Sequence, residues 1–415
     1  MTNTLKKQCC VVGGGPAGMM LGFLLARAGV DVAVLEKHAD FLRDFRGDTV
    51  HPSTLEMMHE LGILDDFLRR PHQQLDRLKV QIGDTSLWAA DFSHLPTHAK
   101  FIALMPQWDF LNFLGEHAAR YPEFQLRMQA EVVDLIQENG DVTGVRAKTP
   151  NGDLTVRSDL VVGSDGRRSI VREKAGLNVV EKGAPMDVLW MRISRQASDP
   201  PQTLGRIDMG RILVMIYRGE YWQCAFVIPK GTAEELKARG IENFRAEIAR
   251  LVPYLRNRLG ELKDWNDVSL LTVKVDRLET WYKPGLLCIG DAAHAMSPIG
   301  GVGINLAVQD AVAAANILAA PLAAGAAPVH MLRKVQDRRE FPTRLTQAVQ
   351  IFAQNRFIGR VLAGNNPIQV PSILKLMQRW PILQRIPARA IGLGARPEHV
   401  KTPEAHRRQD VAKAS

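Results

Sequence analysis

A strand, a glycine-rich loop, a helix and a second strand open this chain of 415 residues, and this order constrains its fold more than any other feature. Gln8 to Val12 is predicted to be a short buried strand, and Pro16 to Ala28 a helix that stops at Gly29. Val30 to Leu35 is then a second strand, which ends at Glu36. Two strands joined by a helix form a parallel βαβ unit, so the sequence predicts an α/β fold with a parallel sheet.

The loop after the first strand has the residues that bind a pyrophosphate. Its glycines permit a tight turn and a close approach of phosphate, and the helix N-terminus adds partial positive charge. Glu36, followed by Lys37, stands where an acidic side chain accepts hydrogen bonds from a ribose. These features predict a dinucleotide site whose loop residues are Gly13, Gly15, Pro16, Ala17 and Gly18.

Two later segments carry similar glycine-rich turns. Asp159 to Gly163 is a predicted strand that leads into Asp165-Gly166. Leu286 to Ile289 is another, and after it a loop opens a helix at about Asn305. In the loop after Ile289, unpaired backbone N–H groups and one carboxylate would surround a flat, polar ligand. Together with the first loop, this predicts one large cofactor that is bound at both of its ends. The candidate residues of this third segment are Gly290, Asp291, Pro298, Gly300, Gly301, Val302, Gly303, Ile304 and Asn305.

Between these segments the pattern changes to alternating strands. Ser53 and Glu56 have the spacing of a capping box, which predicts a helix that ends before Gly62. A strand is expected at 268–278, and after Ala327 the chain should be helical, broken into pieces by prolines at 367, 371, 381 and 387.

The cofactor segments therefore lie at the start, middle and end of the chain. We expect a discontinuous Rossmann-like cofactor domain, an inserted mixed β-sheet substrate domain and C-terminal helices. The expected division is 1–75, 106–180 and 276–330 for the cofactor domain, 76–105 and 181–275 for the substrate domain, and 331–415 for the C-terminal helices and polar tail.

Composition narrows the class of protein further. The net charge is +9, but basic and acidic residues are mixed and no nucleic-acid-binding motif is present, so an anionic substrate or a pyridine nucleotide accounts better for the surplus. The four cysteines lack metal-ligand spacing and no metal is expected. Gly13 to Pro16 interrupts the apolar run that resembles a signal peptide, and no run reaches the length of a membrane span. We therefore expect a cytoplasmic protein, a monomer or homodimer, with at most peripheral membrane contact.

In their order and spacing the three glycine segments resemble the single-component FAD-dependent aromatic hydroxylases of the p-hydroxybenzoate hydroxylase type, which include ubiquinone-biosynthesis hydroxylases. The resemblance implies that the first loop and Glu36 bind the ADP half of FAD. It implies further that Asp165-Gly166 serves FAD and the pyridine nucleotide, and that Gly290-Asp291 meets the ribityl-pyrophosphate. The segment from Pro298 to Asn305 would lie beside the isoalloxazine ring. Arg46 matches a family arginine near the FAD phosphates and Gln107 a glutamine near the flavin, although alone they read as a surface charge and a helix cap.

The resemblance also implies the chemistry. NAD(P)H would reduce FAD, and the reduced flavin would capture O₂ as a C4a-hydroperoxide and transfer one oxygen to an aromatic, quinone-like or polycyclic substrate. The flavin carries this chemistry, so no side chain is assigned as catalytic. The family gives His294 no proton-transfer role.

The substrate pocket is less well marked. Strands at 188–194, 211–217 and 221–228 should cover the flavin, and their aromatic and apolar side chains could line a pocket or form an ordinary core. Few polar groups are placed to anchor a carboxylate, which favours a large apolar or polycyclic substrate. The candidates, grouped by period-two alternation, are Trp190 and Arg192, then Leu213, Met215 and Tyr217, and then Trp222.

Two other enzyme classes remain open. Tyr221 to Pro229 faintly resembles the tryptophan-rich motif of flavin-dependent halogenases but lacks the second tryptophan. A prenyl-chain reductase of the same superfamily is the other alternative, because the apolar segment Ile368 to Leu393 could cover a lipid-like substrate, lie on a membrane or simply close over the cofactor domain.

Overall fold

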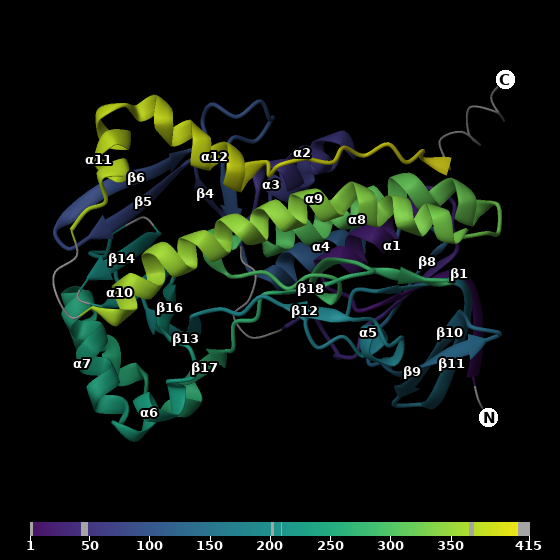
Figure 1. Cartoon of the computed structure of the whole chain (residues 1–415), viewed down its shortest axis with the longest axis horizontal. Coiled ribbons are helices and arrows are strands. Elements are labelled where there is room, and N and C mark those ends of the chain that lie inside the picture. Colours follow the sequence, from purple (N-terminus) through teal and green to yellow (C-terminus); the bar gives the residue numbers. More distant parts are fainter. Residues whose placement is uncertain (1–2, 43–48, 201–202, 209, 365–368, 406–415) are drawn as a thin grey trace.

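The computed structural model describes residues 3–42, 49–200, 203–208, 210–364 and 369–405. Two large sheets lie at opposite ends of an elongated molecule, and long helices run between them along one side (Figure 1). Both parallel and antiparallel strands are present, so the predicted α/β class is confirmed.

The first sheet is built around parallel strands. Its central order is β19-β20-β11-β1-β2-β8, and all neighbours from β20 to β8 are parallel. β9 and β10 extend β11 as an antiparallel hairpin, with a turn at Asn139-Gly140. The strands are β1 (Asn3–Val12), β2 (Val32–Leu35), β8 (Phe124–Arg127), β9 (Glu131–Glu138), β10 (Asp141–Thr149), β11 (Gly152–Gly163), β19 (Tyr282–Lys283) and β20 (Leu286–Cys288).

The second sheet is antiparallel except where β14 meets β5, and its order is β17-β13-β16-β15-β14-β5-β6. Its strands are β5 (Arg77–Ile82), β6 (Thr85–Asp91), β13 (Met186–Ser194), β14 (Leu204–Asp208), β15 (Arg211–Tyr217), β16 (Tyr221–Pro229) and β17 (Val268–Leu271). Two small sheets complete the strands: β3 (Thr49–Val50), β4 (Gln73–Leu75) and β7 (Ile102–Leu104) in one, β12 (Val179–Glu181) and β18 (Asp276–Leu278) in the other.

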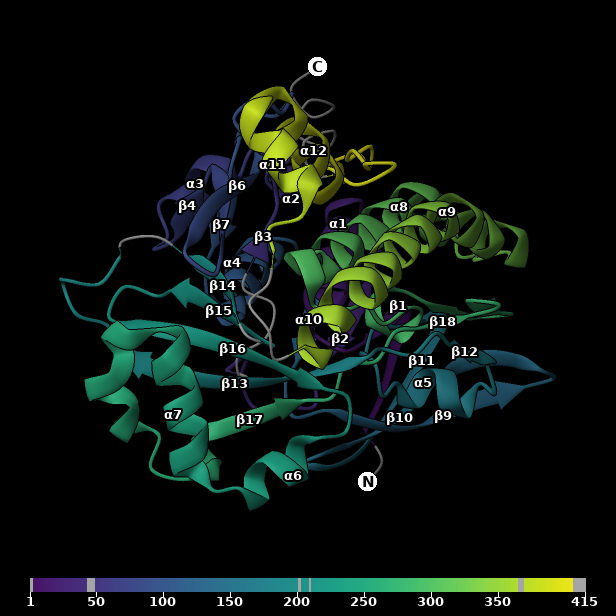
Figure 2. The ribbon, with the colours of Figure 1, turned by 60° about the vertical axis from the view of Figure 1, so that its left-hand side comes forward.

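Helices cover each large sheet separately. Figure 2 shows α8 and α9 side by side next to the first sheet, whereas α7 lies across the second sheet at the far end. Around the first sheet are α1 (Pro16–Arg27), α2 (Pro52–Glu60), α3 (Leu64–Leu68), α4 (Gln107–Ala118), α5 (Ile170–Lys174), α8 (Gly303–Ala323) and α9 (Val329–Ala353). On the second are α6 (Ala233–Ala238), α7 (Ile241–Leu251) and the 3₁₀ helices η1 (Pro253–Glu261) and η2 (Trp265–Asp267). The C-terminal elements are the π-helical turn η5 (Gln354–Ile358), α10 (Gly359–Ala363), α11 (Ser372–Arg379), η6 (Pro381–Gln384) and α12 (Arg385–Gly392).

Three predictions about these elements are wrong. The capping box does not form, because His51 is the N-cap of α2 and Ser53 lies inside the helix. The strand expected at 268–278 is two strands, β17 and β18, which pair in different sheets. Pro387 lies within α12 rather than breaking a helix, since proline is tolerated in the first turn.

The fourth correction concerns α8. Together with the short 3₁₀ helix η4 (Ile299–Gly301) it forms a stretch, Ile299–Ala323, that is long and apolar enough to cross a membrane by length and composition. The prediction that no segment reaches this length is therefore wrong. However, 72% of its most apolar window is buried inside the protein, where α8 packs on α1 and α9, so burial in the core accounts for its composition.

Candidate functional site

The three glycine-rich turns meet at one edge of the first sheet. β1, β11 and β20 are parallel neighbours, so the loops that follow them emerge at the same edge. Ser164 Oγ, just after β11, donates to the carbonyl oxygens of Val12 and Gly13 at 2.9 Å each. Arg167 Nη2 donates to Asp291 Oδ2 at 3.0 Å and so connects the second turn to the third. Segments from three distant parts of the sequence thus form one site.

Steric limits in the first turn explain its glycines. Gly13 has φ +102°, and a Cβ there would lie 2.6 Å from the carbonyl oxygen of Ser164. A Cβ on Gly18 would lie 1.9 Å from the carbonyl oxygen of Gly13. At Gly15, in contrast, a Cβ would meet no atom of the described residues within 4 Å. Space is therefore open directly in front of the helix.

That open space faces the N-terminus of α1. Gly15 is its N-cap and supplies no side-chain hydrogen bond, with Pro16 and Ala17 in the first turn. The first N–H groups of a helix have no partner within the helix, and its dipole favours an anion there. The geometry and donors of this turn therefore fit the pyrophosphate of a dinucleotide.

Glu36, at the end of β2, fixes the same turn. Its side chain is buried, and Oε2 accepts the Gly14 N–H at 2.8 Å while Oε1 accepts the His38 N–H at 3.0 Å. Lys37 beside it is exposed. Arg46, the predicted phosphate contact, lies outside the described residues. Gln107 is half-buried and begins α4, which packs against α1.

The second turn is anchored to α5. Gly166 has φ +85°, and Asp165 Oδ2 accepts the Val171 N–H at 3.3 Å. Asp165 Oδ1 is buried without a hydrogen-bond partner among the residues described here. Burial raises the pKa of this carboxyl above its usual value, although hydrogen bonds from Ser169 and the start of α5 oppose the shift.

The third turn rests on a buried ionic network. Gly290 has φ +58°, and a Cβ there would lie 3.2 Å from Ala307 and 3.3 Å from Ala17. Its N–H donates to Asp310 Oδ2 at 3.0 Å, and the same oxygen lies 2.6 Å from His294 Nε2. His294 therefore packs in the core behind the Gly290 turn, where it shares Asp310 with the Gly290 N–H.

Arg339 of α9 completes this network. Its Nε donates to Asp310 Oδ1 at 2.9 Å and its Nη1 to Glu398 Oε1 at 3.2 Å. Burial would raise the pKa of Asp310, but His294 and Arg339 outweigh it and lower that pKa. The sequence analysis missed Asp310 and Arg339. An aspartate within the alanine-rich run of α8 was the available signal, because a buried charge requires a partner.

The segment from Pro298 to Asn305 is a tight corner joined to α2 and β3. Gly300 and Gly301 have φ +77° and +63°, and Thr49 Oγ1 donates to the carbonyl of Gly301 at 2.8 Å. α8 then starts at Gly303, with Val302 as an N-cap that offers no side-chain hydrogen bond and with Ile304 buried. Asn305 Oδ1 accepts from Ser53 Oγ at 2.5 Å and from Thr54 Oγ1 at 2.9 Å. A second uncapped helix N-terminus thus lies at this site.

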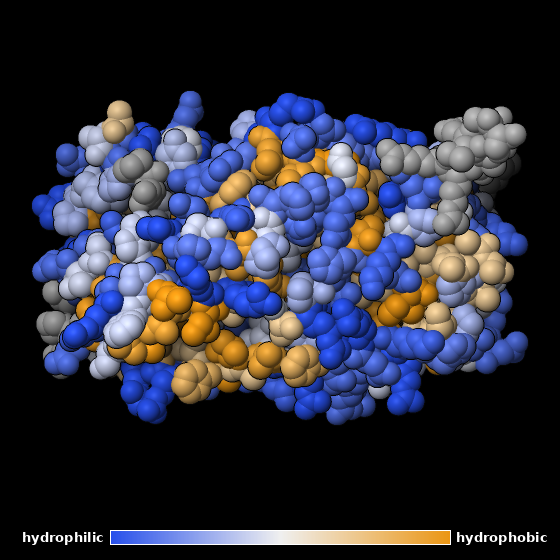
Figure 3. Space-filling model, turned by 90° about the horizontal axis from the view of Figure 1, so that it is seen from above, coloured by the Kyte–Doolittle hydropathy of each residue, from blue (hydrophilic) through white to orange (hydrophobic). Residues whose placement is uncertain are grey.

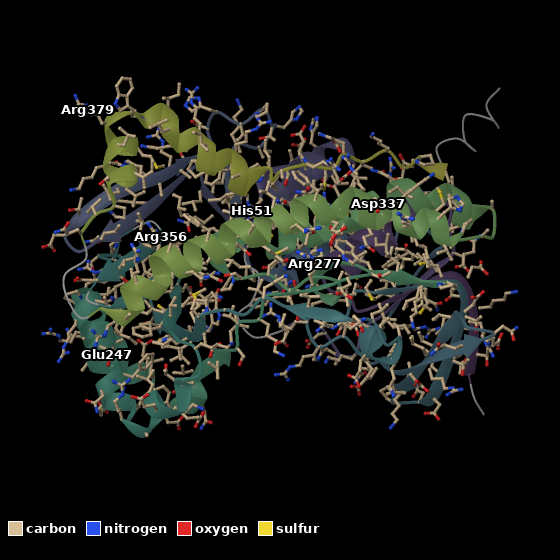
Figure 4. The ribbon with its side chains drawn as sticks, in the orientation of Figure 1. His51, Glu247, Arg277, Asp337, Arg356 and Arg379 are labelled. Atoms are coloured by element: carbon tan, nitrogen blue, oxygen red, sulfur yellow. The ribbon has the colours of Figure 1, made fainter. Side chains whose placement is uncertain are left out.

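His51, labelled in Figure 4, connects this corner to the C-terminal helices. Its Nδ1 hydrogen-bonds the carbonyl of Ile391 on α12 at 2.8 Å. The ring is fully buried, and burial lowers its pKa to about 4 despite that hydrogen bond. The ring is therefore neutral at neutral pH.

The two faces of the second sheet differ in what covers them. Trp190 pairs with Ala225 and Val214 lies beside Ala225, so all three share one face; Ile299 of the glycine corner packs against the same cluster. The opposite face packs under α7 and η1 and contains Leu213, Met215 and Trp222, each at most 1% exposed.

This division separates the predicted substrate residues. Leu213, Met215 and Trp222 occupy a closed core, and Tyr217 packs against the same cluster. Trp190 lies on the cofactor side, whereas Arg192 is exposed and stacks on Tyr221, its guanidinium carbon 3.8 Å from the ring centroid. The pairing register, which the sequence alone does not give, decides which alternate set faces the cofactor.

Two buried donors on the cofactor-facing side have no hydrogen-bond partner in the described part of the chain. They are Trp190 Nε1 and Gln223 Nε2. Gln223 pairs with Arg192 across the sheet, and its Oε1 accepts from Arg218 Nε at 3.0 Å. Since buried donors are normally paired, these two are candidates for ligand contact. The sequence analysis missed Gln223.

A hollow of about 750 Å³ lies elsewhere, between the β5–β6 turn and α11. Ile82, Thr85, Lys375 and Gln378 are among its lining residues, and none of the cofactor candidates is. It is a surface feature separate from the glycine-rich edge.

Comparison with known proteins identifies relatives over nearly the whole chain. A family model described as an FAD binding domain matches residues 6–349. The 6-methylpretetramide 4-monooxygenase of Streptomyces rimosus is 32% identical over 384 residues, which cover 91% of this chain and 91% of the relative.

Solved structures share the fold at lower identity. The OxyS anhydrotetracycline hydroxylase from Streptomyces rimosus superposes with a TM-score of 0.69 at 23% identity, covering 94% of this chain and 76% of that one. The myxobacterial chondrochloren halogenase CndH gives 0.74 at 19% identity, covering 92% and 90%. Because a hydroxylase and a halogenase both match at less than 25% identity, this likeness shows the fold alone.

Proposed function

The chain belongs to the FAD binding domain family and is an FAD-dependent monooxygenase, and on this premise we propose that it hydroxylates a polycyclic aromatic substrate with NAD(P)H and O₂. The observation that carries the proposal is the sheet face beside the glycine corner. That face is apolar around Trp190, Val214 and Ile299, with two buried donors that lack partners among the described residues. Such a surface suits a large flat ring system with few polar groups.

The residues of the glycine-rich edge would hold the cofactor. We assign the α1 N-terminus with Gly15 to the pyrophosphate, Glu36 to the ribose and Asp291 to the ribityl chain. The α8 N-terminus at Gly303 to Asn305 would favour negative charge on the reduced ring. When bound, FAD supplies the redox chemistry, taking electrons from NAD(P)H and passing them to O₂.

The protein's own part is to position the substrate and exclude water. Trp190 Nε1 and Gln223 Nε2 would donate hydrogen bonds to substrate oxygens, which fixes the ring that faces the cofactor. The α12 segment around Ile391, held by His51, would close the pocket against solvent. The substrate named for the 32% identical relative, 6-methylpretetramide, supports a substrate larger than one ring.

The predicted domain division and location remain proposals. The strands of the first sheet come from residues 3–35, 124–163 and 282–288, and those of the second from 77–91, 186–229 and 268–271, which supports an inserted substrate domain. We propose a cytoplasmic enzyme that is a monomer or a homodimer.

One experiment tests the reaction. Purified enzyme with FAD is mixed with NADH or NADPH and a panel of phenols, quinones and polycyclic aromatics, and oxygen uptake and product mass are recorded. We expect polycyclic members to accelerate NAD(P)H oxidation and to gain one oxygen atom. Chloride-dependent halogenated products would overturn the proposal in favour of a halogenase.

A further inference from the structure

A long stretch near the C-terminus has no carboxylate. Between Glu340 and Glu398 the sequence contains no Asp or Glu. Elsewhere acidic and basic residues are mixed, so this segment contributes most of the +9 net charge. Its basic residues are Arg344, Arg356, Arg360, Lys375, Arg379, Arg385, Arg389 and Arg396.

The α11–η6–α12 unit within this stretch exposes large apolar side chains. Five of them are between 44% and 68% exposed, and those on α11 follow helical spacing. Four exposed basic residues, Lys375, Arg379, Arg385 and Arg389, lie among them. We call these nine residues the basic apolar surface; its apolar members are Ile373, Leu376, Trp380, Ile382 and Ile386.

The opposite side of the same unit is firmly attached. Met377, Gln384 and Ala388 are buried against the second sheet's edge, where α11, η6 and α12 contact β6. Gln378 exchanges two hydrogen bonds with the backbone of Trp88 on β6, at 3.3 and 2.8 Å. The unit is therefore a docked element with one outward apolar face.

That face lies at one end of the molecule. Figure 1 places α11 and α12 at the upper left, and Figure 4 labels Arg379 and Arg356 at the same end. Seen from above, hydrophobic patches lie among hydrophilic ones over this half (Figure 3). Apolar and basic side chains thus share an outer surface far from the first sheet's outer edge.

We propose that the basic apolar surface docks the enzyme onto an anionic lipid bilayer. Ile373, Leu376 and Ile386 would enter the acyl boundary, and Trp380 would sit at the level of the headgroups. The four basic residues would contact lipid phosphates. A short amphipathic unit of this composition lies in the interface plane and does not span the membrane.

Charge argues against a second copy of the chain as the occupant. In a two-fold dimer the same patch meets itself, so the four cationic groups of one copy would face the four of the other. The segment between Glu340 and Glu398 has no carboxylate to neutralise them. An anionic surface removes that repulsion. The proposed docking does not depend on the identity of the substrate, because none of the nine residues of the basic apolar surface is a candidate for binding the cofactor or the substrate.

Vesicle flotation tests the docking. The FAD-loaded full chain is mixed with vesicles of phosphatidylcholine alone or of equal parts phosphatidylcholine and phosphatidylglycerol. We expect binding to the anionic vesicles only, and its loss when salt rises from about 0.1 M to about 1 M, which shortens the Debye length from about 10 Å to about 3 Å. Trp380→Phe should remove part of the tryptophan fluorescence change on binding.

A matched pair of variants locates the surface. Replacing Lys375, Arg379, Arg385 and Arg389 by Gln should lower vesicle partitioning at least about 100-fold, since each basic residue near an anionic surface contributes about fivefold. Replacing four exposed lysines elsewhere, Lys148, Lys182, Lys263 and Lys274, by Gln removes the same charge and should change it less than about threefold. Unchanged flavin content in both confirms the fold.

Three results would overturn the proposal. They are absence of wild-type binding to either vesicle, equal effects of the two quadruple variants, and a stable dimer in sedimentation that Ile386→Ser and Trp380→Ser dissociate. Failure of the substrate panel would leave these readouts unaffected, so the two proposals are tested independently.

Discussion

The glycine-rich edge and the second sheet impose different kinds of constraint on the sequence. At the edge, Gly13 and Gly18 are required because any side chain would collide with backbone atoms. In the sheet, either alternate set of apolar residues could face the cofactor, and both sets are mostly buried. The need to avoid backbone collisions is visible in the sequence as glycines spaced a few residues apart. Which face of the second sheet is turned to the cofactor depends instead on which helices cover the other face, and those helices are distant in sequence.

The sharpest test of this contrast lies within the first turn. Gly18→Ala places a Cβ 1.9 Å from the Gly13 carbonyl oxygen, which requires the turn to move. We expect the apoprotein to lose more than about 4 kcal/mol of unfolding free energy, or not to fold. Urea unfolding monitored by circular dichroism measures this.

Gly15→Ala is the matched control, because its Cβ meets no described atom within 4 Å. The apoprotein's unfolding free energy should change by less than about 1 kcal/mol. FAD affinity should nevertheless fall at least about tenfold, since the methyl group occupies the space in front of α1. Normal FAD affinity in Gly15→Ala would refute the placement of the pyrophosphate.

At the third turn the sequence is constrained by buried charged side chains as well as by glycine, because an ionic network supports Gly290. Asp310→Asn removes the fully buried carboxylate that Arg339 and His294 share, and leaves Arg339 with Glu398 as its remaining acidic partner. Removing one partner of a buried ion pair costs about 3–5 kcal/mol, so we expect a loss of that size in chemical unfolding. FAD affinity should fall as well, because the Gly290 N–H also donates to this carboxylate.

Arg338→Gln provides the comparison for that variant. Arg338 is the neighbour of Arg339 and binds the same Glu398 at 2.7 Å, but its side chain is 41% exposed. Because the arginine of this pair is exposed to solvent, we expect the pair to contribute about 1 kcal/mol or less. Equal losses for Asp310→Asn and Arg338→Gln would mean that the network does not support the loop.

His51, which lies between the two regions, makes the folding stability depend on pH. His51 has a folded pKa of about 4, below its ordinary value of 6.5, so the unfolded chain binds a proton that the folded chain does not. Stability is therefore full above about pH 6.5 and falls as the pH drops towards 4, by about 3 kcal/mol in total. Unfolding midpoints measured across this range should show the decline.

His51→Asn should flatten that decline, because the amide does not titrate and can still donate to the Ile391 carbonyl. His98→Asn is the control, since His98 is an exposed histidine beside Glu56. If His51→Asn keeps the wild-type slope between about pH 6.5 and 4, another group causes the acid loss.

These cases show what sequence reasoning can and cannot reach. The βαβ opening, the α/β class and a mixed β-sheet between the cofactor segments followed from periodicity and glycine spacing. Ser53 was misread because its spacing to Glu56 suits a cap, whereas its hydroxyl instead bonds Asn305, 252 residues away. Asp310 was recognisable as an aspartate within an alanine-rich helix, but its partner Arg339 was not, because a contact between α8 and α9 has no local pattern.

The predicted substrate residues lie on different faces of the second sheet, because the sequence does not give the pairing register. Trp190 and Trp222 are both aromatic residues in alternating strands, and nothing nearby in sequence tells one from the other. Only the pairing of Ile193 with Trp222 and of Trp190 with Ala225 places them on opposite faces. A period-two pattern predicts which residues share a face but not what that face touches.

Exchanging each tryptophan for phenylalanine tests this assignment with the smallest expected effect. Trp190→Phe removes an indole N–H that has no partner among the described residues, so unfolding free energy should change by about 1 kcal/mol or less. If that N–H donates to the substrate, KM should rise about fivefold to tenfold while kcat changes little, because a lost ground-state hydrogen bond weakens binding. Trp222→Phe should do the opposite: its Nε1 donates to Asp199 Oδ2 at 2.8 Å in the closed core, so stability falls and KM stays constant. A rise in KM with Trp222→Phe and none with Trp190→Phe would reverse the two faces and place the substrate under α7, where the cofactor turns do not reach.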